Sequence, residues 1–154
     1  MGINSEEITF KRILFPTDFS KISERASAYA TSLGKCYGAK LYVLHVVDLS
    51  LEGGGMYVPH ISFDVLEKEE ESEEAKLLKR FCARLSYPGE DLEPIICSGS
   101  PETEILRVSL EKTADIIIMG TAGEGGVGRL VYGSNTEYVM RNAHVPVLAI
   151  PPAD

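Results

Sequence analysis

The chain has 154 residues, of which 44% are hydrophobic, and its formal net charge is -8. A chain of this length buries about two-thirds of its unfolded surface, so we expect one domain over residues 1–154. The negative charge, without any cluster of Lys and Arg, argues against a nucleic-acid partner, and an anionic ligand would need backbone N–H groups, a helix dipole or a bound cation.

The first part of the chain alternates between short apolar runs and an amphipathic stretch. The apolar run 13–15 predicts a strand, and the apolar residues of 22–37, which recur every three or four positions, predict a helix. Ser20 is the expected N-cap of this helix, and Gly38 is its expected end. The nearly continuous apolar run 41–47 predicts a second strand that is covered on both faces.

The middle of the chain combines a glycine-rich segment with an acidic one. Residues 48–62 show no period and predict a loop. A helix is expected from about 64 to 85, and we interpret its acidic first half, 67–74, as a solvated face; a cation or partner site is the alternative. A third short strand follows at 92–97.

The last part of the chain repeats the same alternation. A serine and a proline at 100–101 open a third helix, as N-cap and first helical residue. The apolar core of 115–119 predicts a fourth strand, and the glycine-rich loop 120–133 leads into a helix over 134–142. The run 145–150 predicts a fifth strand.

Strands and helices alternate throughout, so we expect an α/β fold of the doubly wound type, with an open parallel five-stranded sheet and helices on both faces. Such Rossmann-like folds bind ligands beyond the carboxyl ends of the strands, at the point where the strand order reverses. The loops after the first and fourth strands are therefore the candidate binding loops.

The loop after the fourth strand contains six glycines, which are Gly120, Gly123, Gly125, Gly126, Gly128 and Gly133. A glycine-rich turn that enters a helix can surround phosphates with backbone N–H groups; a flexible surface loop is the alternative. The loop is neither a Walker A motif nor the close-spaced dinucleotide fingerprint.

The spacing Gly120-x-x-Gly123, then nine residues, then Gly133-Ser134 resembles the ATP-binding pattern of the universal stress protein family. The resemblance covers nearly the whole chain except the segment 52–60 and the second helix. Its other blocks are Lys11 to Ser20, Leu44 to Asp48, Gly99-x-Pro101, Asp115 to Gly120 and Val145 to Leu148.

The resemblance implies a nucleotide site on the two candidate loops and the second strand. Thr17, Asp18 and Val46 would face the adenine and ribose, and residues of the glycine loop and the following helix would line the phosphates. The candidate residues are Pro16, Thr17, Asp18, Val46, Gly120, Gly123, Arg129, Gly133, Ser134, Asn135 and Thr136.

Four of these residues have a second interpretation. The Val46 side chain is either an apolar wall of the site or plain core, and Asp18 either binds ribose hydroxyls or caps the first helix. Ser134 is either a phosphate contact or, with Glu137, a capping box. Arg129 is either a phosphate contact or a solvated cation.

The cysteines and histidines indicate neither disulfides nor a zinc site, because no C-x-x-C pair and no ligand spacing occurs. These residues are Cys36, Cys82, Cys97, His45, His60 and His144. We interpret His45 and His144 as structural. The N-terminus lacks the apolar core of a signal peptide, and no apolar run approaches the ~20 residues of a membrane span, so we expect a cytoplasmic protein without a membrane partner.

The predicted function is that of an ATP-binding universal stress protein, a nucleotide-dependent sensor or signalling module, with Mg²⁺ or Mn²⁺ bound through the phosphates. One alternative is a slow metal-dependent ATPase or nucleotidyl transferase, and another is a nucleotide-free dimeric scaffold. The fifth strand, Val145 to Ile150, is expected at a sheet edge, where an uncovered apolar strand favours a homodimer.

Overall fold

The computed structural model describes residues 6–48, 72–122 and 133–153. The strands are β1 (Arg12–Pro16), β2 (Lys40–Asp48), β3 (Leu92–Gly99), β4 (Ile116–Gly120) and β5 (Val147–Ile150). The helices are α1 (Lys21–Tyr37), α3 (Glu73–Arg84), α4 (Pro101–Glu111) and α5 (Ser134–Asn142), with a short 3₁₀ helix, η1 (Gly89–Asp91).

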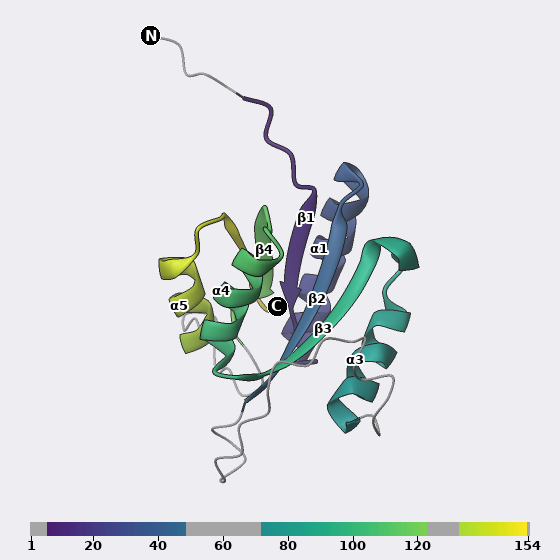
Figure 1. Cartoon of the computed structure of the whole chain (residues 1–154), viewed down its shortest axis with the longest axis vertical. Helices are drawn as coiled ribbons and strands as arrows, with labels where there is room; N and C mark the ends of the chain where they lie inside the picture. The colour runs from purple at the N-terminus through teal and green to yellow at the C-terminus, as the bar shows by residue number, and fades with distance from the viewer. Residues whose placement is uncertain (1–5, 49–71, 123–132, 154) are drawn as a thin grey trace.

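The five strands form one parallel sheet in the order β3-β2-β1-β4-β5 (Figure 1). The chain runs outward from β1 through β2 to β3 and then returns to place β4 on the other side of β1. The strand order therefore reverses between β1 and β4. The predicted doubly wound α/β fold is confirmed.

Helices cover both faces of the sheet, and the side chains of β1 alternate between two apolar cores. Phe15 shares one core with residues of α1 and α3, among them Leu78. Leu14 points to the opposite face and shares a core with Val108 of α4 and Val139 of α5. Strands buried on both faces need apolar side chains at every position, which explains their unbroken apolar runs.

The predicted ends of α1 are confirmed. Ser20 is the N-cap, and its side chain accepts the backbone N–H of Ser23. Gly38 ends the helix in the left-handed conformation, at φ 59°, which a residue without a Cβ adopts at little cost. None of the helices in the described ranges is both long and apolar enough to cross a membrane.

Two predicted boundaries are wrong. Ser72 is extended and caps α3, so a helix that continues through this residue from position 64 is excluded; residues 64–71 themselves lie outside the described ranges. The fifth strand begins at Val147 instead of Val145. Pro146 precedes it, and a proline has no N–H to donate to a ladder.

Gly120 ends β4 at the point where α1 crosses the sheet. A Cβ on Gly120 would lie 2.5 Å from Cγ2 of Ile22 in α1, well inside van der Waals contact. The sequence pattern assigns Gly120 to the phosphates, and close packing of α1 is a second, independent reason for a glycine at this position.

Replacing Gly120 by alanine should lower the free energy of unfolding by about 1–3 kcal/mol, because the new Cβ overpacks against Ile22. Ile22→Ala removes Cγ2, so the double variant should be more stable than the sum of the two single losses predicts. Urea unfolding measures this coupling. Gly89→Ala is the matched control, since nothing lies within 4 Å of a Cβ there. Additive losses at Gly120 and Ile22 would contradict the close contact.

Candidate functional site

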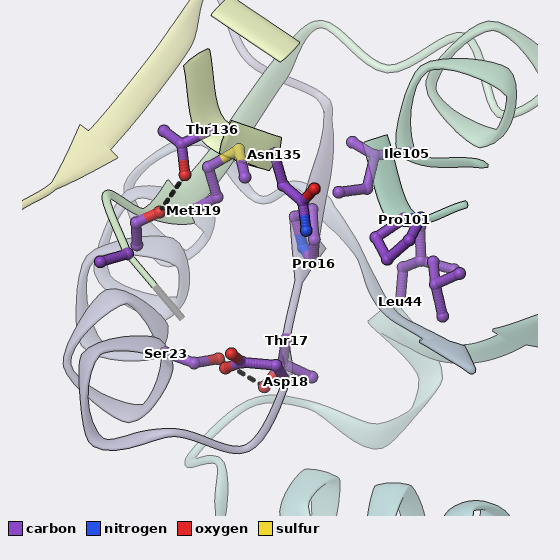
Figure 2. A pocket seen from close by; sticks show the side chains of 13 residues that line it. Pro16, Thr17, Asp18, Ser23, Leu44, Pro101, Ile105, Met119, Asn135 and Thr136 are labelled. Atoms are coloured by element: carbon purple, nitrogen blue, oxygen red, sulfur yellow. Dashed lines mark hydrogen bonds between the residues drawn. The ribbon is translucent and has the colours of Figure 1, made fainter. Parts of the chain in front are cut away.

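A pocket of about 120 Å³ lies where the strand order reverses, beyond the carboxyl ends of β1 and β4 (Figure 2). It is bounded by the loop after β1, the end of β2 and the first turns of α4 and α5. Its lining residues are Pro16, Thr17, Asp18, Ser23, Leu44, Val46, Pro101, Ile105, Met119, Gly120, Ala122, Asn135 and Thr136.

The loop between β1 and α1 is shaped by its own polar side chains. The buried Thr17 hydroxyl forms a hydrogen bond with the Ser23 hydroxyl and accepts the N–H of Phe19 at 3.0 Å. Phe19 adopts φ 64°, which a residue with a bulky side chain reaches only when its surroundings impose it. The turn thereby brings Thr17 and Asp18 to the edge of the pocket, as Figure 2 shows.

Asp18 is not the N-cap of α1. Its Oδ1 accepts the N–H of Ser20 at 3.1 Å, and Ser20 is itself the residue that caps the helix. An aspartate that binds the backbone two residues ahead forms a local turn of its own. The alternative in which Asp18 caps the helix is therefore wrong, and the carboxylate remains at the pocket.

Four of the lining side chains, those of Leu44, Val46, Ile105 and Met119, form an apolar wall of the pocket. These residues come from β2, α4 and β4 and belong to, or pack against, the core beneath α4 and α5. Val46 is only half-buried. The two interpretations of its side chain are thus compatible, because it packs on the core and also faces the pocket.

The first turn of α5 differs from the predicted capping box. Gly133 is the N-cap, with φ -56° and ψ 146°, and its carbonyl accepts the N–H of Glu137 at 3.1 Å. Ser134 is the first helical residue, so its hydroxyl is one position too late to cap the helix. Gly133 needs no positive φ, and its N–H already donates to the Thr121 carbonyl at 2.8 Å.

A second hydrogen bond attaches α5 to β4. The buried Thr136 hydroxyl donates to the Gly120 carbonyl at 2.9 Å (Figure 2). Together with the bond from Gly133 to Thr121, it holds the N-terminus of α5 beside the end of β4. Free N–H groups and the positive end of the helix dipole are located at such a terminus.

The structure brings most of the predicted residues together. The described ones that line the pocket are Pro16, Thr17, Asp18, Val46, Gly120, Asn135 and Thr136. Gly133 and Ser134 lie beside it at the start of α5. Gly123 and Arg129 lie outside the described residues.

Sequence reasoning missed six lining residues, which are Ser23, Leu44, Pro101, Ile105, Met119 and Ala122. Two of them carried a usable signal. Leu44 is two positions before Val46 in the same strand and so shares its face, and Pro101 is the first residue of a helix that follows a strand end. In the sequence, nothing distinguishes Ile105 from any other apolar residue on a helix face.

His45 lies in β2 between Leu44 and Val46. Its Nδ1 is 2.9 Å from the Thr17 carbonyl oxygen, and its ring packs at a tilt of 33° against that of Phe19, with 4.5 Å between the ring centroids. Burial lowers the pKa of the imidazole, and the bond to Thr17 and the negative charges of Glu74 and Asp18 oppose this shift. The interpretation of His45 as a structural residue agrees with these contacts.

The sequence pattern of the universal stress protein family matches residues 9–151. The universal stress protein MJ0531 of Methanocaldococcus jannaschii is 34% identical over 154 residues, which cover 96% of this chain and 86% of that protein. The solved structure of protein MJ0577 from the same organism has a TM-score of 0.73 at 28% identity, with 96% and 99% of the two chains covered.

Two further solved structures share the fold at lower identity. One is a universal stress protein in complex with cAMP, with a TM-score of 0.68 at 21% identity over 93% of this chain and 98% of the other. The second is the universal stress protein from Archaeoglobus fulgidus in complex with dAMP, with a TM-score of 0.62 at 20% identity over 93% and 99%.

The lowered pKa of His45 predicts how stability depends on pH. The unfolded chain takes up a proton near pH 6.5, whereas the folded protein does so only at lower pH. The contribution of His45 to stability is therefore complete above pH 6.5 and is lost as the pH falls through the folded pKa. Urea unfolding between pH 7.5 and 5 should show a decline that is smaller in His45→Asn. The exposed His144, replaced by Asn, is the control and should keep the decline of the wild type.

Proposed function

The chain belongs to the universal stress protein family, and from this premise we propose that it binds an adenine nucleotide, ATP foremost, in the pocket at the ends of β1 and β4. In this proposal it acts as a nucleotide-dependent sensor or signalling module of the stress response. Two proteins of the same fold are described in complex with cAMP and with dAMP, which are both adenine nucleotides.

One observation carries the proposal: the pocket combines an apolar wall with polar groups suited to the remainder of a nucleotide. The wall offers Leu44, Val46, Ile105 and Met119 to a flat base. Asp18, on the loop between β1 and α1, can accept hydrogen bonds from ribose hydroxyls. An apolar cleft with a few oriented polar groups is typical of a small-molecule site.

The phosphates would lie at the N-terminus of α5. Ser134, Asn135 and Thr136 form its first turn, where backbone N–H groups have no acceptor within the helix. The N–H of Gly133 is bound to Thr121, so we assign the phosphates to Ser134 and Asn135 in its place. We propose that Mg²⁺ or Mn²⁺ is bound through the phosphates, because Asp18 is the one carboxylate among the described lining residues.

Asp18→Asn should weaken ATP binding by about tenfold or more, because a hydrogen bond to a charged group contributes about 1.5–3 kcal/mol. The amide keeps the oxygen that accepts the Ser20 N–H, so the loop should remain folded. Isothermal titration with Mg-ATP measures the affinity. Glu90→Gln removes an exposed carboxylate from η1 and should bind like the wild type.

Mass spectrometry of nucleotide released from the denatured wild type tests the ligand class directly. ATP in the released fraction supports the proposal. If no adenine nucleotide is released and none binds in the titration, the proposed function is wrong.

We propose further that two copies of the chain pair through β5. This strand is at one edge of the sheet, and its residue Leu148 is 38% exposed. An apolar edge strand offers unpaired backbone groups and apolar surface to a second copy.

Leu148→Lys should convert the dimer into a monomer, because a charged side chain would be buried at the interface. Light scattering at micromolar concentration measures the mass. Leu110→Lys is the matched control, since Leu110 is also an exposed leucine, at 57%, but lies on α4. A monomeric wild type, or a dimer that survives Leu148→Lys, would refute pairing through β5.

A further inference from the structure

His45 occupies the position in β2 at which its pairing with β1 stops being regular. The last register pair is Pro16 with Leu44, so Thr17 is opposite His45. The Thr17 N–H donates to the Leu44 carbonyl at 2.8 Å. In a regular parallel ladder, the Thr17 carbonyl would next accept the N–H of Val46.

The Thr17 carbonyl instead contacts the side chain of its register partner. Nδ1 of His45 lies 2.9 Å from the carbonyl oxygen. A carbonyl oxygen only accepts, so Nδ1 carries the proton in this contact. The backbone bonds of the described residues include the one from Thr17 to Leu44 but none from Val46 to Thr17.

The ring is held in place from the other face of the sheet. Leu44 and Val46 line the pocket, and because side chains alternate along a strand, His45 points away from it. There its ring packs at a tilt against that of Phe19, and the Phe19 ring in turn lies 5.7 Å from that of Phe81. The charged residues that face it are Glu74 of α3 and Asp18 of the loop.

The backbone N–H and C=O of Val46 point to the same side of β2 as those of Leu44, toward β1. β1 ends at Pro16, so the N–H and C=O of Val46 face the pocket instead of a neighbouring strand. A donor next to an acceptor complements the edge of adenine that carries the 6-amino group and N7, whereas the same edge of guanine presents two neighbouring acceptors, O6 and N7.

We infer that His45 is a positioning residue for base recognition: by binding the Thr17 carbonyl, it keeps that carbonyl from pairing with Val46 and leaves the Val46 amide available to adenine. This inference rests on the proposed function for its ligand. The arrangement of Thr17, His45 and Val46 can be measured without any ligand.

The first experiment is amide hydrogen exchange of the ligand-free protein, followed by NMR. In the wild type the Val46 amide should exchange readily, because the Thr17 carbonyl does not accept a hydrogen bond from the Val46 N–H. In His45→Leu the carbonyl is released to Val46, and exchange of that amide should slow by tenfold or more. His45→Asn retains a donor near the position of Nδ1 and should keep the fast exchange. A protected Val46 amide in the wild type would overturn the inference without any variant.

The second experiment compares ATP with GTP. His45→Leu should lose about three- to tenfold in ATP affinity, the equivalent of one hydrogen bond, while its weaker GTP affinity stays unchanged. His45→Leu should therefore show a smaller preference for ATP over GTP than the wild type, whereas His45→Asn should keep the wild-type preference. A general loss of folding would lower both affinities together, and the exposed His144, replaced by Leu, is the control that should change neither.

The outcomes separate the two proposals. If the wild type binds no adenine nucleotide but Val46 exchange responds to His45 as described, the proposed function fails and the positioning role stands. If ATP binds and His45→Leu retains both the preference for ATP and the fast exchange, the positioning role is wrong. If His45→Leu does not fold, His45→Gln, which moves the donor outward, should show the same losses.

Discussion

β1 ends at Pro16, whereas β2 continues to Asp48, and this difference in strand length creates the candidate site. The described pairing between the two strands stops at Leu44. Beyond that point, the side of β2 that faced β1 offers backbone donors and acceptors, and alternate β2 side chains supply an apolar wall. Backbone polar groups in a sheet require partners, and at this place a ligand can provide them.

The turn that leaves β1 is held by side chains, since its backbone departs from the ladder. Thr17, Asp18 and Ser20 each bind a backbone N–H one turn or less along the chain. The imidazole of His45 adds the contact with the neighbouring strand. These bonds fix the loop before any ligand arrives, and a preformed site loses less conformational entropy on binding.

The other side of the site depends on how α5 is attached to β4. The bonds from Gly133 to Thr121 and from Thr136 to Gly120 fix the direction of the helix at its first turn. Because Gly120 has no Cβ, α1 can also pack closely against the opposite face of the sheet at this position. The end of β4 therefore positions α5 over the pocket and α1 behind it.

The sequence by itself determined the elements and their class. The local signals are the unbroken apolar runs of the strands, an apolar period of about 3.6 residues in the helices, and Ser20 and Gly38 at the two ends of α1. They depend only on the backbone within a few residues. The position of the site followed from the alternation of strands and helices, and most of its predicted residues line the pocket.

The tertiary structure alone decided that Gly133 caps α5 and donates its N–H to the Thr121 carbonyl. It also decided that His45 binds Thr17, 28 residues earlier in the chain. Such contacts depend on strand register and helix placement, which no local pattern encodes.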